Sequence, residues 1–350
     1  MLVEDSATEL YLLQKVFALA PDMEVVACAR NGREALDLLP QVKPDVVCTD
    51  YQMPVMNGLE FIIKAMKQSP CAIVVLSVAV QSFHKDNIFK LLSAGAVDVL
   101  AKPLGQAGGL GEQEARQLLD KIHAIAQSPA LRRRLATATP GATPSARVLL
   151  PSGGARVGMV AIGASTGGPQ ILQRILSQLP RQFAAPLVCV QHISEGFLDG
   201  MVGWLQSSCA LKMGVAQQGL TPQAGHVYFA PHGHHLVLNT HQRFQYVART
   251  ALDLHCPRVD DLMQSVAKAY GASALGVLLS GMGRDGAQGL KAMRDAGAPT
   301  IAQDEATSVI FGMPAAAIAL GAAKYVLSTD EIAAMLVRLG GSGTASGHLG

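Results

Sequence analysis

The feature that most constrains the fold is an apolar run at residues 157–162 followed directly by the small residues GASTGG at 163–168. An apolar run of this kind predicts a buried parallel strand, and the small residues predict a tight turn into a helix. The segment also fits the pattern G-x-S-x-G, which exposes a serine hydroxyl at the tip of a strand. Ser165 is therefore a candidate nucleophile, or a residue that helps a loop to hold phosphate.

Composition narrows the class of protein. The 350 residues suffice for two domains, and 49% hydrophobic with 15% charged residues favours compact domains over disorder. The net charge of +2 is too small to indicate nucleic acid as a partner. The six cysteines are dispersed and predicted to be reduced thiols. Since the sequence shows neither an apolar run long enough to span a membrane nor a leader pattern, we expect a cytoplasmic protein without direct membrane insertion.

Short apolar runs alternate with amphipathic segments in two stretches of the chain, which predicts two α/β units. In the first unit we expect strands at residues 24–28, 45–49, 72–77 and 97–100, and helices from about Ala7, Gly32, Gly58, Asp86 and Glu112. The spacings Ser6-x-x-Glu9 and Asn31-x-x-Glu34 predict that glutamates close the caps of two of these helices.

Residues 128–156 break this alternation. They are rich in proline and small residues, which predicts an exposed linker, and the run Arg132-Arg133-Arg134 is interpreted as a solvated helix end. A second α/β unit is predicted from residue 157 to about residue 339, followed by a flexible tail rich in glycine and serine.

Five polar side chains fall where strands of the first unit are predicted to end: Glu4, Asp5, Asp50, Ser77 and Lys102. The carboxyl ends of parallel strands lie side by side, so the three carboxylates can converge on a hard cation such as Mg²⁺. A hydroxyl and an ammonium beside them suit phosphoryl transfer onto Asp50. Each acid alone would be interpreted as an ordinary surface group, whereas five residues at five fitting positions favour a site.

These residues make segment 1–126 resemble the receiver domain of bacterial response regulators, on the stretches 3–6, 49–58 and 101–103. The resemblance implies a flavodoxin-like fold with Asp50 as the phosphoacceptor. It also implies phosphate partners and magnesium ligands, namely Ser77 and Lys102 for the phosphate, and Glu4, Asp5, Asp50 and the Gln52 carbonyl for the metal. Two departures stand out: the first strand, residues 1–3, is short, which suggests a native start upstream, and Val99 replaces the usual switch aromatic.

Two more candidate residues follow predicted strands of the second unit. His192 comes after the run at 186–190, and Asp285 lies in the glycine-rich turn after the run at 274–279. With Ser165 they would supply a nucleophile, a general base and an orienting carboxylate. Taken singly, each could be a helix cap or a hydrogen-bonded core residue, but jointly they favour a triad. Backbone N–H groups of the two turns, Thr166–Gly168 and Gly281–Gly283, are candidate oxyanion donors. Within these turns we expect Thr166, Gly167, Met282 and Gly283 to form the neighbourhood of the substrate and the oxyanion.

A competing pattern overlaps the same turn. Residues 281–286 match G-x-G-x-x-G, and Asp304 lies near the position of a ribose-binding acid, which together indicate a dinucleotide site. However, Asp285 would place a carboxylate in the turn that receives pyrophosphate, and Ser165 and His192 would have no role. We therefore disfavour this reading.

The cluster His232, His234 and His235 offers a possible zinc site. No cysteine or acid lies nearby at a usual ligand spacing. A surface turn between two strands, at residues 227–230 and 236–238, is the preferred interpretation.

Residues 157–339 resemble the catalytic domain of the chemotaxis protein-glutamate methylesterase (CheB) family, on the stretches 162–169, 190–192, 228–231, 280–287 and 311–314. The resemblance implies a doubly wound, mainly parallel sheet. It also implies Ser165, His192 and Asp285 as the catalytic triad, with Thr166 and Met282 lining the site. Arg284 stands where many relatives have asparagine.

The two resemblances leave only the linker, 127–156, and the tail, 340–350, uncovered. They imply a phosphorylation-regulated esterase that acts on methyl-glutamate, and as a glutaminase on glutamine, in the cytoplasmic domain of chemoreceptors. A chemotaxis histidine kinase would be the phosphodonor, Mg²⁺ would serve the receiver, and no cofactor is implied for the esterase. The alternative is a non-catalytic, receiver-linked binding module. A transcriptional regulator is disfavoured because no basic recognition helix follows the linker.

Overall fold

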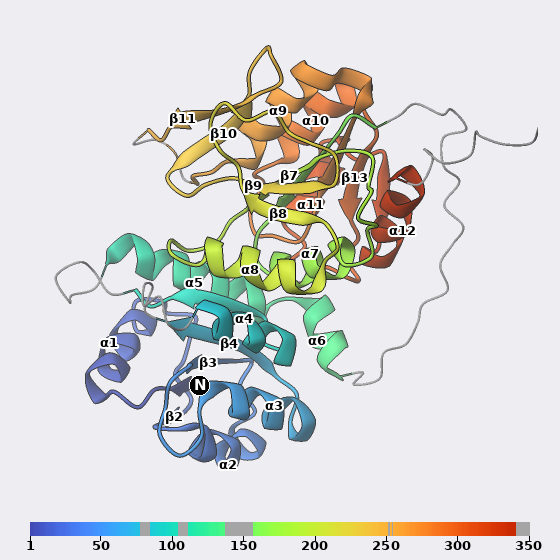
Figure 1. Cartoon of the computed structure of the whole chain (residues 1–350). Coiled ribbons are helices and arrows are strands. Elements are labelled where there is room, and N and C mark those ends of the chain that lie inside the picture. The colour runs from blue at the N-terminus through green and yellow to red at the C-terminus, as the bar shows by residue number, and fades with distance from the viewer. Residues whose placement is uncertain (78–84, 104–110, 137–156, 251–252, 254, 341–350) are drawn as a thin grey trace, which may run out of the picture. The chain divides into compact units, whose positions relative to one another are not determined.

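The computed structural model describes residues 1–77, 85–103, 111–136, 157–250, 253 and 255–340 (Figure 1). The chain divides into two compact units. We call Met1–Pro140 with Ile193–Gly200 the N-terminal unit, and Gly141–His192 with Met201–Gly350 the C-terminal unit. In the part of the chain that is described, no helix is both long and apolar enough to cross a membrane.

The N-terminal unit is built on a five-stranded parallel sheet in the order β2-β1-β3-β4-β5. Its strands are β1 (Leu2–Val3), β2 (Cys28–Ala29), β3 (Val46–Asp50), β4 (Ala72–Ser77) and β5 (Asp98–Ala101). The predicted apolar runs form the three neighbouring strands β3, β4 and β5. β4 is buried along its whole length, as is expected of a central parallel strand. This order is that of the flavodoxin-like fold, which confirms the predicted architecture.

Helices cover both faces of this sheet. They are α1 (Ala7–Phe17), α2 (Gly32–Val42), α3 (Gly58–Gln68), α4 (Lys85–Ala94) and α5 (Glu112–Ala126). α1 packs against α5, whereas α2, α3 and α4 pack one beside the next (Figure 1). The Asn31 side chain accepts hydrogen bonds from the backbone of Arg33 and Glu34, and the Glu34 carboxylate returns to the Asn31 side chain and the Arg30 N–H, so this predicted cap forms.

Two expectations for the N-terminal unit are wrong. The strand predicted at residues 24–28 is only β2, because its single neighbour β1 offers two residues for pairing, Leu2 with Cys28 and Val3 with Ala29. The predicted linker contains a further helix, α6 (Pro129–Ala136), in which Ala130 and Leu131 are buried. The run Arg132–Arg134 is an exposed helix end, as expected. The rest of the predicted linker, 137–156, and residues 341–350 of the predicted tail lie outside the described residues.

The C-terminal unit is built on a seven-stranded sheet in the order β14-β13-β12-β6-β7-β9-β8, with every neighbouring pair parallel. Its strands are β6 (Met159–Ala164), β7 (Leu187–Gln191), β8 (Lys212–Val215), β9 (His226–Phe229), β12 (Ala274–Leu278), β13 (Thr300–Gln303) and β14 (Tyr325–Leu327). From β6 the chain continues into β7 on one side and later returns to β12 on the other. The strand order thus reverses at β6, where α/β sheets form their ligand crevice.

The remaining elements complete a doubly wound arrangement. The helices are α7 (Gly168–Leu176), α8 (Leu198–Ser208), α9 (Val259–Tyr270), α10 (Ala287–Asp295), α11 (Met313–Ala319) and α12 (Thr329–Gly340), with a 3₁₀ turn at Gly271–Ser273. α9 packs against α10 and α10 against α11, while α7 packs against α12 (Figure 1). A separate antiparallel pair is formed by β10 (His234–Leu238) and β11 (Phe244–Ala248).

The core around β6 depends on glycine for close approach. A Cβ at Gly163 in β6 would lie 2.3 Å from Val259 Cγ1, so a larger residue would push α9 away from the sheet. All six cysteines are free of disulfides, and Cys48, Cys189 and Cys209 are buried. Burial raises the pKa of the Cys48 thiol to about 12, which keeps it protonated and inert.

Candidate active site and phosphoacceptor site

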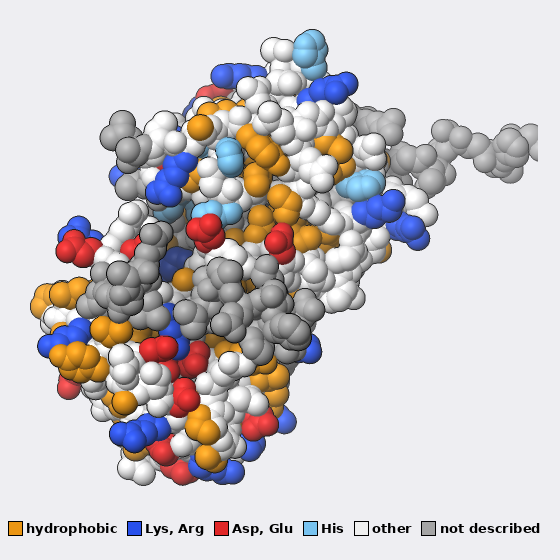
Figure 2. All heavy atoms as spheres, turned by 60° about the vertical axis from the view of Figure 1, so that its left-hand side comes forward, with side chains coloured by type: hydrophobic (Ala, Val, Ile, Leu, Met, Phe, Trp, Pro, Cys, Tyr) orange, Lys and Arg blue, Asp and Glu red, His pale blue; other side chains and the backbone are white. Residues whose placement is uncertain are grey.

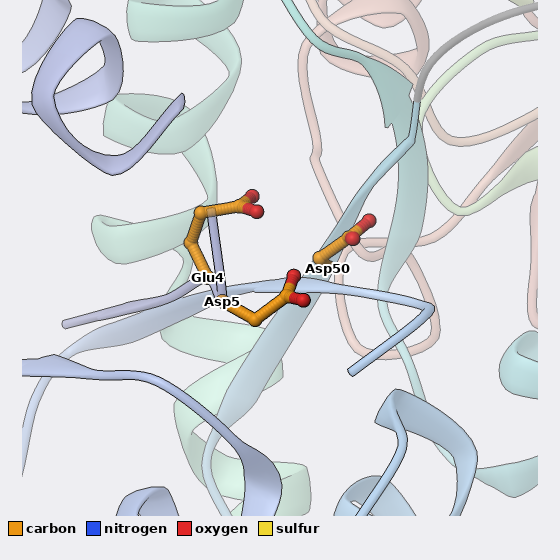
Figure 3. Close-up of side chains that lie close together, drawn as sticks. All are labelled: Glu4, Asp5 and Asp50. Carbon is orange, nitrogen blue, oxygen red and sulfur yellow. The ribbon is translucent and has the colours of Figure 1, made fainter. Parts of the chain in front are cut away.

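Three carboxylates gather at the carboxyl edge of the N-terminal sheet. Glu4 and Asp5 follow β1, Asp50 ends β3, and one oxygen from each lies within 4.8 Å of the others (Figure 3). Glu4 is only 1% exposed, and burial raises the pKa of Glu4 and of Asp50. Glu4 is buried, Asp50 is partly buried and Asp5 is exposed, so the cluster is open to solvent on one side. Carboxylate oxygens with room for water are the ligands that Mg²⁺ prefers, so these residues fit the predicted ion.

Lys102, directly after β5, neutralises part of this cluster. Its Nζ lies 2.8 Å from Glu4 Oε2 and 3.4 Å from Asp50 Oδ1, and it also contacts the Glu9 carboxylate. Burial lowers the pKa of the ammonium, but Asp50 and the two glutamates outweigh this effect and raise it. Lys102 is therefore cationic beside Asp50.

Glu9 is a residue of this site that the sequence interpretation missed. It was expected to close the cap of α1, and the Ser6 hydroxyl does accept the Glu9 N–H at 3.3 Å. However, the Glu9 side chain contacts Lys102, and it is Glu4 Oε1 that accepts the Ser6 N–H, at 3.2 Å. The available signal was the spacing: Glu9 lies one turn beyond Asp5, on the first turn of α1.

The other predicted phosphate partner, Ser77, lies at the same edge. Ser77 is the last residue of β4 and is 8% exposed, and its carbonyl accepts the Lys102 N–H at 2.9 Å. Val99 is buried within β5, in register with Val75 of β4. Gln52 follows Asp50 by two residues, and its carbonyl stays a predicted ligand.

Ser165 lies at the corresponding edge of the C-terminal sheet, directly after the central strand β6. Its N–H donates to the carbonyl of Ser280, which follows β12, at 2.9 Å. Gly281 packs against it so closely that a Cβ there would lie 2.7 Å from Ser165 Cβ. Ser165 is 5% exposed. The turn after β12 thus holds the serine in place.

His192 comes directly after β7, the strand on the other side of β6. Its N–H donates to the carbonyl of Ala164 at 2.9 Å, which ties it to the residue before Ser165. Its Nε2 lies 2.9 Å from Asp285 Oδ2. The His192 ring also stacks on the ring of His255, with centroids 4.7 Å apart. The predicted base and orienting carboxylate are therefore paired.

Asp285 is held by the first turn of α9 as well as by His192. Its Oδ2 accepts the Val259 N–H at 2.8 Å and its Oδ1 accepts the Asp260 N–H at 3.0 Å. Burial raises the pKa of this carboxyl, but the hydrogen bond and charge of His192 and the two backbone N–H groups outweigh burial and lower it. Asp285 is ionised, and it caps α9 while orienting the imidazole.

The Ser165 hydroxyl and His192 come from adjacent strand ends, but no hydrogen bond joins the two side chains among the described residues. Nε2 of His192 is used by Asp285, so Nδ1 is the ring nitrogen that is left to act as a base. Hydrogen bonds of this kind are often long in a ligand-free site and tighten with substrate.

Four backbone N–H groups near Ser165 donate to no acceptor in the part of the chain that is described. They belong to the predicted oxyanion residues Thr166, Gly167, Met282 and Gly283. In contrast, the Gly168 N–H donates to the Ser165 carbonyl at 2.8 Å. Unpaired N–H groups in tight turns are suited to stabilise an oxyanion.

The contacts in the structure do not support a dinucleotide site at residues 281–286 or a zinc site at residues 232–235. Asp285, inside the G-x-G-x-x-G turn, is an ionised carboxylate bonded to His192, and Asp304 Oδ1 accepts the Thr307 N–H at 3.0 Å. His235 is buried in β10 and lies 3.1 Å from Asp253 Oδ2, so the predicted surface turn is shorter than expected. His232 and His234 are exposed, and the groups of metal-ligating side chains among the described residues do not include this cluster. Figure 2 shows histidine side chains at the surface, with basic and acidic side chains intermixed over that face.

Sequence comparisons with known proteins cover nearly the whole chain. Residues 1–110 match the response regulator receiver domain, and residues 160–336 match the CheB methylesterase domain. A protein-glutamate methylesterase/protein-glutamine glutaminase 1 of Syntrophus aciditrophicus is 39% identical over 98% of each chain. A protein of the same name from Cupriavidus pinatubonensis is 41% identical over 96% of each chain.

A solved structure is similar in fold to the C-terminal unit. The catalytic domain of the Thermotoga maritima CheB methylesterase is 36% identical, has a TM-score of 0.50, and matches over 52% of this chain and 98% of its own length. The order of the strands, the residue ranges of the two family matches and the relatives of nearly equal length all indicate the same two-domain family. The chain belongs to the CheB methylesterase family, with an N-terminal response regulator receiver domain.

Proposed function

We propose that this protein is a phosphorylation-regulated methylesterase of the cytoplasm. It hydrolyses γ-glutamyl methyl esters on the cytoplasmic domain of chemoreceptors and deamidates glutamines at such positions. The observation that carries the proposal is the His192–Asp285 pair, 2.9 Å apart, held beside the Ser165 strand end. Family membership supports the substrate class, because the curated relatives are named for both activities.

In this mechanism, Nδ1 of His192 takes the proton of the Ser165 hydroxyl as Oγ attacks the ester carbonyl. His192 then gives that proton to the departing methoxide, so methanol leaves and an acyl-serine forms. A water molecule, deprotonated by the same imidazole, hydrolyses the acyl-serine and releases glutamate. Ammonia replaces methanol when the substrate is glutamine.

Asp285 supports each proton transfer without itself becoming protonated. Its lowered pKa keeps it anionic, so it stabilises the imidazolium and fixes the ring orientation. The negative oxygen of the tetrahedral intermediate would be stabilised by the unpaired N–H groups of Thr166, Gly167, Met282 and Gly283. Unpaired donors that are already in place need no reorganisation during the reaction.

The receiver domain would control this activity through Asp50. A chemotaxis histidine kinase is the proposed phosphodonor. The Asp50 carboxylate attacks the phosphoryl group, the P–N bond to the phosphohistidine of the kinase breaks, and the imidazole leaves. Lys102 and the Ser77 hydroxyl would contact the bound phosphate, and Lys102 is already 3.4 Å from Asp50 Oδ1. When bound to Glu4, Asp5, Asp50 and the Gln52 carbonyl, Mg²⁺ would neutralise charge on the phosphoryl group.

The test is methanol release from methylated receptor fragments, with and without acetyl phosphate and Mg²⁺. We expect release that rises with the phosphodonor and vanishes in Ser165→Ala. Release that does not change with the phosphodonor would support the esterase activity and contradict its control by the receiver domain. No release with active controls would favour the alternative, a non-catalytic binding module. The ionised, hydrogen-bonded Asp285 argues against that alternative, since a binding module has no need of a poised imidazole.

A further inference from the structure

The last residue of β7, Gln191, connects the backbone of the two residues that would exchange a proton. Its side-chain Nε2 donates to the Ser165 carbonyl at 2.8 Å and to the His192 carbonyl at 2.9 Å. Gln191 is 5% exposed, so these bonds are protected from water. One amide nitrogen therefore bridges the two main chains, in addition to the pairing of β6 with β7.

The amide can take only one orientation. Turning it over would place its oxygen against two carbonyl oxygens, which repel it. In the observed orientation, Oε1 is buried and has no hydrogen-bond partner among the described residues. It faces Gly168, where a Cβ would lie only 2.1 Å away. Gly168 thus leaves the space that the Gln191 amide needs, at the cost of a buried acceptor.

The same amide contributes to a wider set of bonds on Ser165. The Ser165 carbonyl accepts from the Gly168 N–H as well as from Gln191, both at 2.8 Å, and the Ser165 N–H donates to Ser280. On the base, the His192 N–H donates to Ala164, so the Gln191 bond is a second link between the two strand ends. Removing Gln191 removes one bond from each residue of the pair at once.

We propose that Gln191 is a positioning residue of the esterase reaction: its amide holds Ser165 and His192 at the separation that proton transfer requires. This inference rests on the proposed function of those two residues. Gln191 does not touch the substrate. Its contribution is to the geometry of the nucleophile and base, so it should change the rate of the chemical step and leave substrate binding unchanged.

The first test is Gln191→Met in the full-length protein, which keeps an unbranched side chain of similar length and removes both donors. We expect kcat for methanol release to fall about 10- to 100-fold with KM unchanged. The rate at which a fluorophosphonate probe labels Ser165 should fall by a similar factor. The matched control is Gln206→Met, because Gln206 Nε2 also bridges two carbonyls, those of Cys209 and Leu211, at 3.3 and 3.0 Å. That control should react at the wild-type rate.

A second variant, Gln191→Glu, separates positioning from general packing. Protonated, the new carboxyl can donate to one carbonyl; ionised, it repels both. The defect in kcat relative to the wild type should therefore deepen with rising pH, by about tenfold between roughly pH 5.5 and 8.5. A packing defect would give a ratio that does not depend on pH.

The outcomes separate this inference from the proposed function. If the wild type is labelled by the probe but releases no methanol, the assigned substrate is wrong. The rate at which the probe labels Gln191→Met, relative to the wild type, then tests the role of Gln191 by itself. Wild-type rates of labelling and of methanol release in Gln191→Met would overturn it. Failure of both variants to give a cooperative thermal transition would assign Gln191 a purely structural role and overturn it too. An unlabelled wild type would overturn both proposals.

Discussion

The N–H of Val259 donates to Asp285 Oδ2 at 2.8 Å, so the oxygen that faces His192 is the one anchored on the first turn of α9. Val259 also packs against the glycine at position 163 of β6. Helix α9, the central strand and the predicted catalytic pair therefore form one rigid arrangement. A helix N-terminus carries partial positive charge, which keeps the aspartate ionised beside a histidine that must gain a proton.

We expect Asp285→Asn to lower kcat about 10³- to 10⁴-fold, because the amide reverses the preferred imidazole tautomer. The amide NH2 group must also lie against a backbone N–H, that of Val259 at the Oδ2 position or that of Asp260 at the Oδ1 position. Thermal unfolding should show a loss of roughly 1–2 kcal/mol from the α9 cap. Steady-state methanol release and calorimetry check both values.

The control for this variant is Asp330→Asn. Asp330 pairs with Arg174 at the surface, and both side chains are about 60% exposed. Exposed pairs contribute little, so kcat should be unchanged and stability should change by less than about 0.5 kcal/mol. Equal kinetic defects in the two variants would contradict the assigned role of Asp285.

The ionisation of Asp285 also predicts a pH dependence of stability. Because its folded-state pKa is lowered, the carboxylate stabilises the fold above its unfolded pKa, near 4, and loses this effect as the pH falls through the folded value. The difference in unfolding temperature between wild type and Asp285→Asn should be constant from about pH 5 to 8 and shrink below about pH 4. Taking the difference removes the contributions of the other acids. A difference that grows on acidification would reject the lowered pKa.

Ser165→Ala should abolish methanol release and probe labelling while the unfolding temperature stays within a few degrees of the wild-type value. The expected stability is unchanged because the backbone bonds at this position, to Ser280, Gly168 and Gln191, do not involve the hydroxyl. Near-normal release would remove Ser165 as the nucleophile.

The sequence predicted the edges of the two sheets better than the contacts made there. Alternating apolar runs place Asp50, Ser165 and His192 after strands, because burial of a parallel strand requires an apolar run. The sheet order confirms that the runs before Ser165 and His192 form the neighbouring strands β6 and β7. The bond from Asp285 to the start of α9 has no local signature, since it joins residues 26 positions apart.

The errors follow from the same limit. Whether residues 24–28 pair as a strand depends on the length of β1, which is a property of the neighbour and not of the segment. Glu9 has the spacing of a capping residue, but a cationic side chain 93 positions away outcompetes the backbone for it. The helix at Pro129–Ala136 is stabilised by burial of Ala130 and Leu131, which a composition rich in small residues does not reveal.

Asp50→Asn should remove phosphoryl incorporation from radiolabelled acetyl phosphate and leave basal methanol release unchanged. The amide cannot act as the acceptor, and the change lies in the N-terminal unit, whose sheet does not include the strands that carry the Ser165 site. Stimulation by acetyl phosphate should therefore be lost. Label retained on this variant would identify another residue as the acceptor.

Glu9→Gln should accelerate phosphorylation of Asp50. Three carboxylates, Glu4, Glu9 and Asp50, lie within 4.0 Å of the ammonium of Lys102, and Asp5 adds a fourth negative charge beside Glu4 and Asp50. An anionic phosphodonor must approach this excess of negative charge. Neutralising Glu9 removes one charge and releases Lys102 towards Asp50. A change of about 1 kcal/mol corresponds to a rate roughly fivefold higher with acetyl phosphate.

The control for Glu9→Gln is Glu60→Gln, which neutralises an exposed acid in the first turn of α3, the position that Glu9 has in α1. Its phosphorylation rate should match the wild type, because Glu60 is not among the carboxylates paired with Lys102. Raising the ionic strength should shrink the advantage of Glu9→Gln only slightly, since Lys102 is buried and screening acts mainly on exposed charges. A slower rate in Glu9→Gln would show instead that Glu9 holds Lys102 in its working position.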